Sequence, residues 1–311
     1  LRGTVGRSDF TGKATIEKRN GHTQIDGSIS ASRFDFADLS TDAGQARAKA
    51  KEARIGKRIT PDTAIDLSHL GNTDGSLHIH ADRLLWPGSK PFRALDATLT
   101  LDDRTLTISP LRFAMPRGVL SGSATVTQKD AGPQLHLQLT LKGAQLSDLF
   151  PATGIDAKAS GKVDLTGMGN TIRAAIGTAN GRATLVARNG SLPDRTALLL
   201  GQDAGGLFSG KKKQAQLRCL IAPFVFQSGT ARAQSVLIDT NRAVTRAAGT
   251  ISFPSEKLNL ALHGVAKQGS TLRIGGAIPV GGTISAPDVG RPAKGDTVGD
   301  IIGQVGKAIF G

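Results

Sequence analysis

Apolar and polar residues alternate along most of this chain, which is the pattern of β-strands with one apolar face. The clearest stretch is residues 134–142, where leucines take every second position and polar residues the positions between. Similar alternation recurs at residues 76–82, 95–101, 120–127 and 257–262. Short strands that follow one another at these intervals predict antiparallel meanders rather than strand–helix–strand units.

Turn residues separate these runs. Residues 102–104 and residues 128–133 each stand between two alternating runs, and both predict hairpin turns. The adjacent carboxylates of Asp102 and Asp103 are better explained by such a turn than by a catalytic pair, because neighbouring strand residues face opposite ways.

Helical patterns are few and short. Residues 37–55 are rich in Ala, Lys, Arg and Gln, and residues 144–150, 194–209 and 297–310 have weaker helical spacing, with glycines interrupting the last two. The predicted fold class is therefore mainly β: a curved antiparallel sheet, forming a groove or a partly open barrel or sandwich, with a few short helices.

A sheet with one apolar face must cover that face with a second sheet, helices or a ligand. The pattern by itself favours a closed core over a groove. If a groove is present, the alternating rows supply its candidate lining residues: Leu77, Ile79, Leu99, Leu101, Leu120, Leu135, Leu137, Leu139, Leu258, Leu260 and Leu262.

The formal net charge of +14 favours anionic surfaces such as nucleic acid, acidic lipid headgroups or polyanionic glycolipid. The one dense basic cluster, Lys211 to Lys213, reads as a solvated loop. Nucleic-acid partners are not expected, because aromatic residues are scarce (11 Phe, one Trp, no Tyr) and do not alternate with basic ones. A polyanion-binding surface is a minor alternative. The lone Cys219 excludes an internal disulfide, and its apolar neighbours predict a buried, inert thiol.

Residues that could carry catalysis are sparse. His78 and His80 fall on the polar side of one expected strand, and two solvated side chains explain them better than a metal site, since no further ligands complete a shell. The sequence has no nucleophile elbow, phosphate-binding loop or zinc-protease motif. We therefore expect no enzyme activity, no cofactor, no metal and no catalytic residue.

Several loose motifs occur in a fixed order, and their combination is more specific than any one of them. They lie at residues 1–6, 10–12, 32–39, 60–67, 74–81, 95–101, 106–111, 118–124, 218–220, 229–231 and 278–287. Together they resemble the C-terminal region of AsmA family proteins over nearly the whole chain.

The resemblance implies a non-catalytic protein on the periplasmic side of the inner membrane in the Gram-negative envelope. It implies a groove whose apolar inside carries phospholipid or another acyl lipid between the inner and outer membranes, and so reverses the preference for a closed core. The chain has no apolar run of about 18 residues, and it starts within an expected strand. We therefore expect a longer protein whose membrane anchor lies upstream.

The resemblance also divides the chain. Residues 1–36 would end a preceding β repeat, 37–59 would be a helical basic linker, 60–290 the AsmA-like β domain, and 291–311 a flexible or amphipathic tail. A second hypothesis stays open: a scaffold or regulator of outer-membrane assembly that binds envelope proteins through exposed strand edges.

Overall fold

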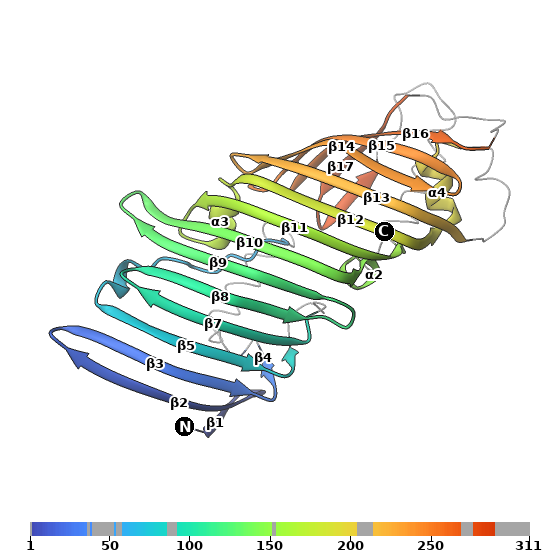
Figure 1. The fold of residues 1–311 in the computed structure, drawn as a ribbon. Helices are drawn as coiled ribbons and strands as arrows, with labels where there is room; N and C mark the ends of the chain where they lie inside the picture. Colours follow the sequence, from blue (N-terminus) through green and yellow to red (C-terminus); the bar gives the residue numbers. More distant parts are fainter. Residues whose placement is uncertain are drawn as a thin grey trace. The chain divides into compact units, whose positions relative to one another are not determined.

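The structure is a computed structural model that describes residues 2–35, 38, 53, 58–85, 92–150, 154–203, 214–268 and 276–289. Strands dominate the described residues and helices are few and short (Figure 1). The chain divides into two compact units, residues 1–142 with 163–179 (unit 1) and residues 143–162 with 180–311 (unit 2). The predicted division at residues 36, 59 and 290 stays a prediction.

Unit 1 holds the first strands and one short α-helix. Its elements are β1 (Arg2–Val5), β2 (Ser8–Arg19), β3 (His22–Ala31), β4 (Phe34–Asp35), the 3-10 helix η2 (Ser68–Leu70), β5 (Thr73–Ala81), β6 (Leu84–Leu85), β7 (Ala94–Asp102), β8 (Thr105–Ala114), β9 (Val119–Lys129), most of β10 (Gly132–Gln145), part of β11 (Asp156–Met168) and α3 (Ile172–Ile176).

Unit 2 holds the remaining strands and two short helices. Its elements are the ends of β10 and β11 together with α2 (Leu146–Leu149), β12 (Asn180–Pro193), α4 (Asp194–Leu200), β13 (Gln214–Gln227), β14 (Thr230–Thr240), β15 (Ala243–Ser252), β16 (Lys257–Ala266), β17 (Ile278–Thr283) and β18 (Ala286–Val289).

The hydrogen-bonded strand order follows the sequence almost throughout, as a meander requires. The 16-stranded sheet has the order β1-β2-β3-β5-β7-β8-β9-β10-β11-β12-β13-β14-β15-β16-β17-β18, and β4 pairs with β6 in a separate two-stranded sheet. This open order confirms the predicted fold class.

The expectation of antiparallel pairing is wrong at β3 and β5. These strands are parallel, with a register that runs from Thr23 opposite Thr73 to Ala31 opposite Ala81. Parallel neighbours need a long crossover, and residues 32–72 supply one here. The short strands β4 and β6 are also parallel.

Both predicted hairpin turns are confirmed. Asp103 and Arg104 have φ of 40° and 57°, the left-handed values that a two-residue turn requires, and they connect the paired residues Asp102 and Thr105. The second turn connects Lys129 to its partner Gly132.

The predicted helices at residues 144–150 and 194–209 appear as the shorter α2 and α4, with residues 204–209 outside the described part. The predictions for 37–55 and 297–310 also lie outside the described residues, apart from positions 38 and 53. Helix α3 was not predicted; the Thr171 hydroxyl accepts a hydrogen bond from the Ala174 amide at 3.1 Å and caps it. None of the helices described is long and apolar enough to cross a bilayer.

Candidate functional site

The apolar face of unit 1 is built by strand pairing, because residues directly opposite each other on neighbouring strands point to the same side. The registers of β5, β7, β8, β9 and β10 align their apolar residues in four parallel rows. Two are end rows: Leu101, Leu106, Val126 and Leu135 at one end of the strands, and Ala81, Leu95, Phe113, Leu120 and Leu141 at the other. Two are middle rows: Leu77, Leu99, Ile108, Ala124 and Leu137, and Ile79, Ala97, Leu111, Gly122 and Leu139.

Different elements cover the two end rows. At the first, α3 and the segment before η2 pack on the sheet through Ile172, Ala175, Ile65 and Leu67. Backbone hydrogen bonds of 2.9 to 3.0 Å join residues 63–65 to residues 170–172 and fix that segment beside α3. At the second, the β4–β6 pair and Phe92 pack through Phe34 and Leu84. The rings of Phe92 and Phe113 pack there at a tilt of 45°, with 4.9 Å between their centroids.

Most side chains of the middle rows are half-buried, as are most of those in the end rows, while Ala97 and Ala124 of the middle rows are buried. Leu77, Leu99, Ile79, Leu111 and Leu139 are all half-buried. Towards β2 the first end row itself becomes exposed: Ile16, which continues that row through Ile25 and Gly75, is 69% exposed. Unit 1 therefore carries a strip of aliphatic side chains, the middle rows, between two covered margins.

Glycines in the strand interiors shape this face. Gly122 of β9 lies in a middle row with φ of +154°, and a Cβ there would stand 1.9 Å from the carbonyl oxygen of Gln138. In unit 2, Gly249 of β15 has φ of +137°, and its Cβ would stand 2.2 Å from the Asn259 carbonyl oxygen. Only glycine accepts these positions, and such glycines bend strands locally.

Unit 2 carries an apolar face of its own, on which the candidates Leu258, Leu260 and Leu262 lie side by side along β16. Leu258 stands opposite Ile251, Leu260 opposite Gly249 and Val280, and Leu262 opposite Ala247 and Ile278. All three leucines are half-buried.

Helix α4 covers one end of this face. The Thr245 hydroxyl donates to the Leu200 carbonyl oxygen at 2.5 Å, and a Cβ on Gly264 would stand 1.7 Å from that same oxygen. The Arg242 guanidinium holds the start of the helix through Asp194, with Nε 2.9 Å from Oδ1. The absence of a side chain at Gly264 thus permits the close approach of α4.

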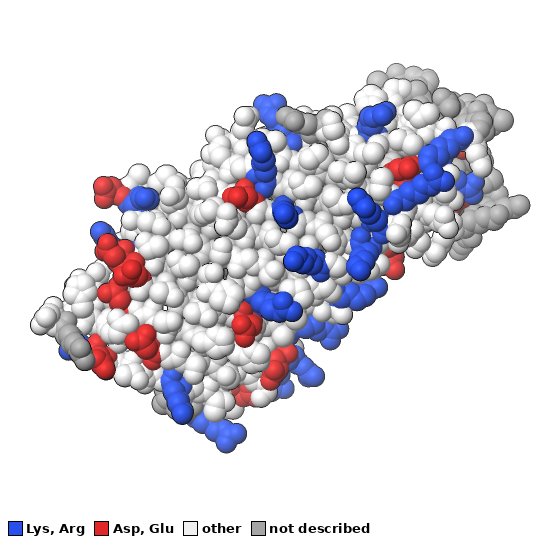
Figure 2. Space-filling model, in the orientation of Figure 1, with Lys and Arg blue, Asp and Glu red and all other residues white. Residues whose placement is uncertain are grey.

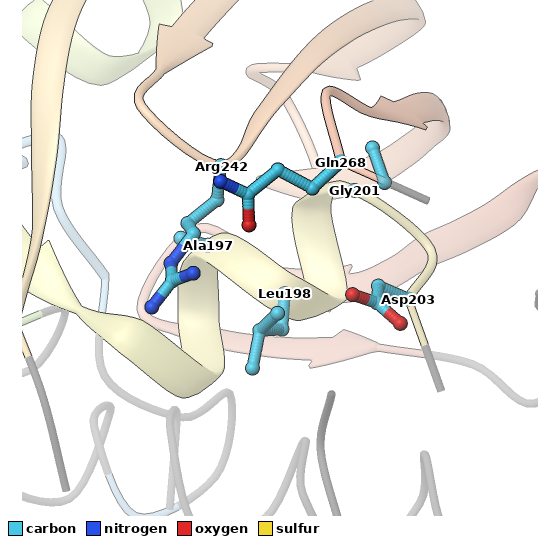
Figure 3. Close-up of a pocket in the computed structure, with 7 residues that line it drawn as sticks. Ala197, Leu198, Gly201, Asp203, Arg242 and Gln268 are labelled. Atoms are coloured by element: carbon cyan, nitrogen blue, oxygen red, sulfur yellow. The ribbon is translucent and has the colours of Figure 1, made fainter. Parts of the chain in front are cut away.

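A small recess lies beside α4. Figure 3 shows its lining, which includes Leu198, Asp203 and Arg242. Because Arg242 is already bonded to Asp194, the recess offers little free binding chemistry, and we assign no ligand to it. The apolar faces remain the candidate site.

Comparison with known proteins gives a family. The model of the AsmA family matches residues 1–236 of this chain. The chain belongs to the AsmA family. It is similar to the AsmA family protein YhjG of Escherichia coli strain K12, at 22% identity over 311 residues. The alignment includes 94% of this chain and 45% of YhjG, so the chain spans less than half of that relative. No solved structure gives a significant match.

AsmA family membership indicates a role in the cell envelope. All the candidate residues of this AsmA family chain lie on the apolar face of their unit. Leu101 and Leu135 fall in one end row and Leu120 in the other, while the remaining candidates of unit 1 lie in the middle rows. Whether lipid touches them stays a prediction.

Sequence reasoning missed some residues of the same face. Ile108 and Leu111 both belong to the middle rows although three positions separate them, because the pairing of β8 shifts register between them. Strict alternation of apolar and polar residues therefore fails in β8, because it assigns only one of Ile108 and Leu111 to this face. The sequence did contain a signal for this register shift: apolar residues alternate at Leu106 and Ile108 before it and again at Leu111 and Phe113 after it.

The opposite face of unit 1 bears His80 and His136, and their partners are carboxylates. His80 Nδ1 is 3.1 Å from Asp96 Oδ2, and His80 Nε2 is 3.2 Å from Asp82 Oδ1. Hydrogen bonds that the ring donates to the carboxylates of Asp96 and then Asp82 raise the pKa of His80. Likewise, His136 Nε2 lies 3.1 Å from Asp164 Oδ1, and this hydrogen bond lowers the pKa of Asp164. Within the described residues no group of His, Cys, Asp and Glu is arranged to hold a metal ion.

Proposed function

We propose that the apolar faces of this chain hold the acyl chains of phospholipids, and that the chain forms part of a conduit moving lipid between the inner and outer membranes. In this proposal it lies on the periplasmic side of the inner membrane, reached through an anchor upstream, and catalyses no reaction. The observation that carries the proposal is the aliphatic, mostly half-buried strip of the two middle rows in unit 1, between margins on which other elements pack.

The dimensions of the strip suit acyl chains that run across the strands. From β3 to β10 the face spans six strands, about 24 Å at the usual spacing, and the two middle rows leave a width of about 13 Å along the strands. A bilayer core of about 30 Å gives each leaflet roughly 15 Å of acyl chain. A chain of that length fits along the strip with its headgroup beyond the sheet.

The composition of the strip suits a mobile ligand. Its side chains are Leu, Ile, Ala and Gly, which offer apolar contact without a polar group that would fix one position. Taking two acyl chains with about 30 methylenes through water costs on the order of 25 kcal/mol. A continuous aliphatic strip removes most of that cost and needs no catalytic residue.

Site-specific photocrosslinking tests the proposal. A photoreactive side chain replaces Leu99 or Leu139, in the middle rows, and the matched controls carry it at Thr98 or Gln138, the next positions on the opposite face. The purified chain is incubated with phosphatidylethanolamine vesicles and irradiated, and adducts are identified by mass spectrometry. We expect lipid adducts at positions 99 and 139 and none at the controls.

A charged substitution gives the second arm. Leu99→Glu should reduce lipid recovered with the purified chain at least fivefold, whereas Thr98→Glu should leave it unchanged. Equal adducts on both faces, or a wild-type chain that carries no lipid while folded, would contradict the conduit. Protein adducts at the exposed edge strand β1 instead would favour a scaffold that binds envelope proteins by strand addition.

A further inference from the structure

Unit 2 presents aliphatic side chains on the face opposite its apolar face. Val186, Ile221 and Leu237 stand side by side on β12, β13 and β14, because Val186 pairs with Ile221 and Ile221 with Leu237. Their chain neighbours Leu220 and Ile238 pack into the core on the other side. All three are half-buried, so the sheet surface has an aliphatic centre here.

Exposed arginines surround this centre. Arg246 follows Leu237 in the same row, Arg188 lies two positions along β12 from Val186, and Arg182 and Arg232 flank Val225. Figure 2 shows several basic side chains over the region where β12 and β13 run in Figure 1. We call the aliphatic centre and these arginines the arginine patch; its members are Val186, Ile221, Leu237, Arg182, Arg188, Arg232 and Arg246.

No acidic side chain in the part of the chain that the structure describes neutralises the positive charge of the patch. Among the described residues, none of these four arginines takes part in an ion pair. Asp239 lies next to the patch, opposite Val244, but its carboxylate already binds the Lys267 ammonium. Guanidinium groups therefore meet solvent around an aliphatic centre, and their stems can lie along it while the charged ends point outward.

We propose that the arginine patch docks on a membrane surface rich in acidic phospholipid headgroups. From β12 to β15 the guanidinium groups are spread over about 14 Å across the strands. A protein partner would have to place its carboxylates to match that spread. A lipid surface offers acidic headgroups at every spacing, and the aliphatic centre faces the interfacial region. Charge complementarity thus favours a membrane, and the inference does not depend on lipid entering the apolar face.

Vesicle sedimentation of the full chain tests the patch. Vesicles of phosphatidylglycerol mixed equally with phosphatidylcholine are compared with phosphatidylcholine alone, at low and high salt. We expect binding to the acidic vesicles, lost at high salt because the arginines act through screened charge. Each arginine removed should weaken binding about fivefold. The triple variant Arg188→Gln, Arg232→Gln, Arg246→Gln should therefore lose roughly a hundredfold.

Two controls separate this patch from net charge and from misfolding. Lys13→Gln, Arg112→Gln and Lys142→Gln remove the same charge from the opposite face of unit 1, and this variant should bind nearly as the wild type does. Replacing the three arginines of unit 2 by lysine should restore most of the binding. The proposal fails if the triple glutamine variant binds like the wild type, or if the unit 1 variant loses as much. It also fails if the folded wild type ignores acidic vesicles, or binds both kinds equally at any salt.

Discussion

The two units share one face and differ on the other. In each, alternating strands form an apolar face that a short helix covers at one end, α3 in unit 1 and α4 in unit 2. On the opposite side, unit 1 presents small polar and titratable residues: Ser76, His78, His80, Thr98, Thr100, Ser121, Ser123 and Thr125. At the corresponding side of unit 2 stand Val186, Ile221 and Leu237 with arginines around them.

This difference distinguishes the face whose residues the fold requires to be apolar from the face on which it sets no such requirement. A one-layered sheet needs an apolar face to hold its covering elements, and both units meet that demand with similar residues. A solvent-facing side has no such requirement, so serine, threonine and scattered charged residues such as Lys13 and Arg112 suffice there in unit 1. Unit 2 instead places half-buried aliphatic side chains on this side with exposed arginines around them, an arrangement that the proposed docking on a membrane surface would explain.

The largest effect should come from the glycines that both apolar faces require. Gly122→Ala in unit 1 and Gly249→Ala in unit 2 should each lower the free energy of unfolding by about 3 kcal/mol or more, because each adds a carbon within 1.9 and 2.2 Å of a carbonyl oxygen at positive φ. Chemical denaturation followed by circular dichroism measures the change.

Two other glycines calibrate that result. Gly21 has φ of +82°, but a Cβ added there would meet nothing within 4 Å, so Gly21→Ala should cost about 1 kcal/mol through φ alone. Gly3 has open space and no positive φ, so Gly3→Ala should be nearly neutral. If Gly122→Ala costs no more than Gly21→Ala, the close strand approach at the middle rows is not needed.

The attachment of α4 should be the next most sensitive feature, and it belongs to unit 2. Asp194→Ala should cost about 2 kcal/mol, since it leaves Arg242 beside the helix without its carboxylate; the side chains of this pair are 9% and 31% exposed. Arg242→Ala should cost a similar amount, and the double variant little more than either single one. Strictly additive losses in that cycle would mean that the pair does not act together.

Much of this architecture followed from the sequence, because alternation directly encodes which face is apolar. The leucines of residues 134–142 and the turn at residues 102–104 were predicted correctly for this reason. Long-range pairing left no such local trace. The parallel pairing of β3 with β5 depends on a crossover through residues 32–72, and α3 is held by contacts with residues 63–65 that are far away in the chain.

The opposite face of unit 2 shows a different limit. Arg182, Arg188, Arg232 and Arg246 are dispersed over three strands in the sequence, and only the registers bring them around Ile221 and Leu237. The expectation that Cys219 is buried was wrong for a related reason: after a register shift between Leu217 and Cys219, Cys219 stands opposite Arg188 and Asp239 and is half-buried. Lys211 to Lys213 lie outside the described residues.

A smaller effect should distinguish the two sides of unit 2. Ile238→Thr places a hydroxyl in the core cluster beside Leu217 and should cost about 2 kcal/mol. Leu237→Thr, one residue away on the arginine patch, should cost less than about 1 kcal/mol, because solvent can reach the new hydroxyl. Thermal unfolding of both variants gives the comparison. Equal losses would make the aliphatic centre a structural element and weaken the case for docking.

The smallest effect should separate the opposite faces of the two units by pH. His80 of unit 1 has a pKa raised by hydrogen bonds that its ring donates to Asp96 and Asp82, and His78 Nε2 also lies 3.6 Å from Asp96 Oδ2. Since the folded pKa lies above the unfolded value of about 6.5, protonation of His80 favours the folded state. This contribution is complete below about pH 6.5 and disappears as the pH rises through the folded pKa. The side chain is 43% exposed, so solvent screening limits this contribution to less than about 1 kcal/mol.

We expect unfolding midpoints to show that His80→Gln loses stability relative to the wild type at acidic pH and little at alkaline pH. His263→Gln in unit 2 is the matched control, because His263 lies opposite Arg246 and no acidic partner for it occurs among the described residues. An identical pH profile for wild type and His80→Gln would mean that the carboxylates beside His80 do not stabilise its charge.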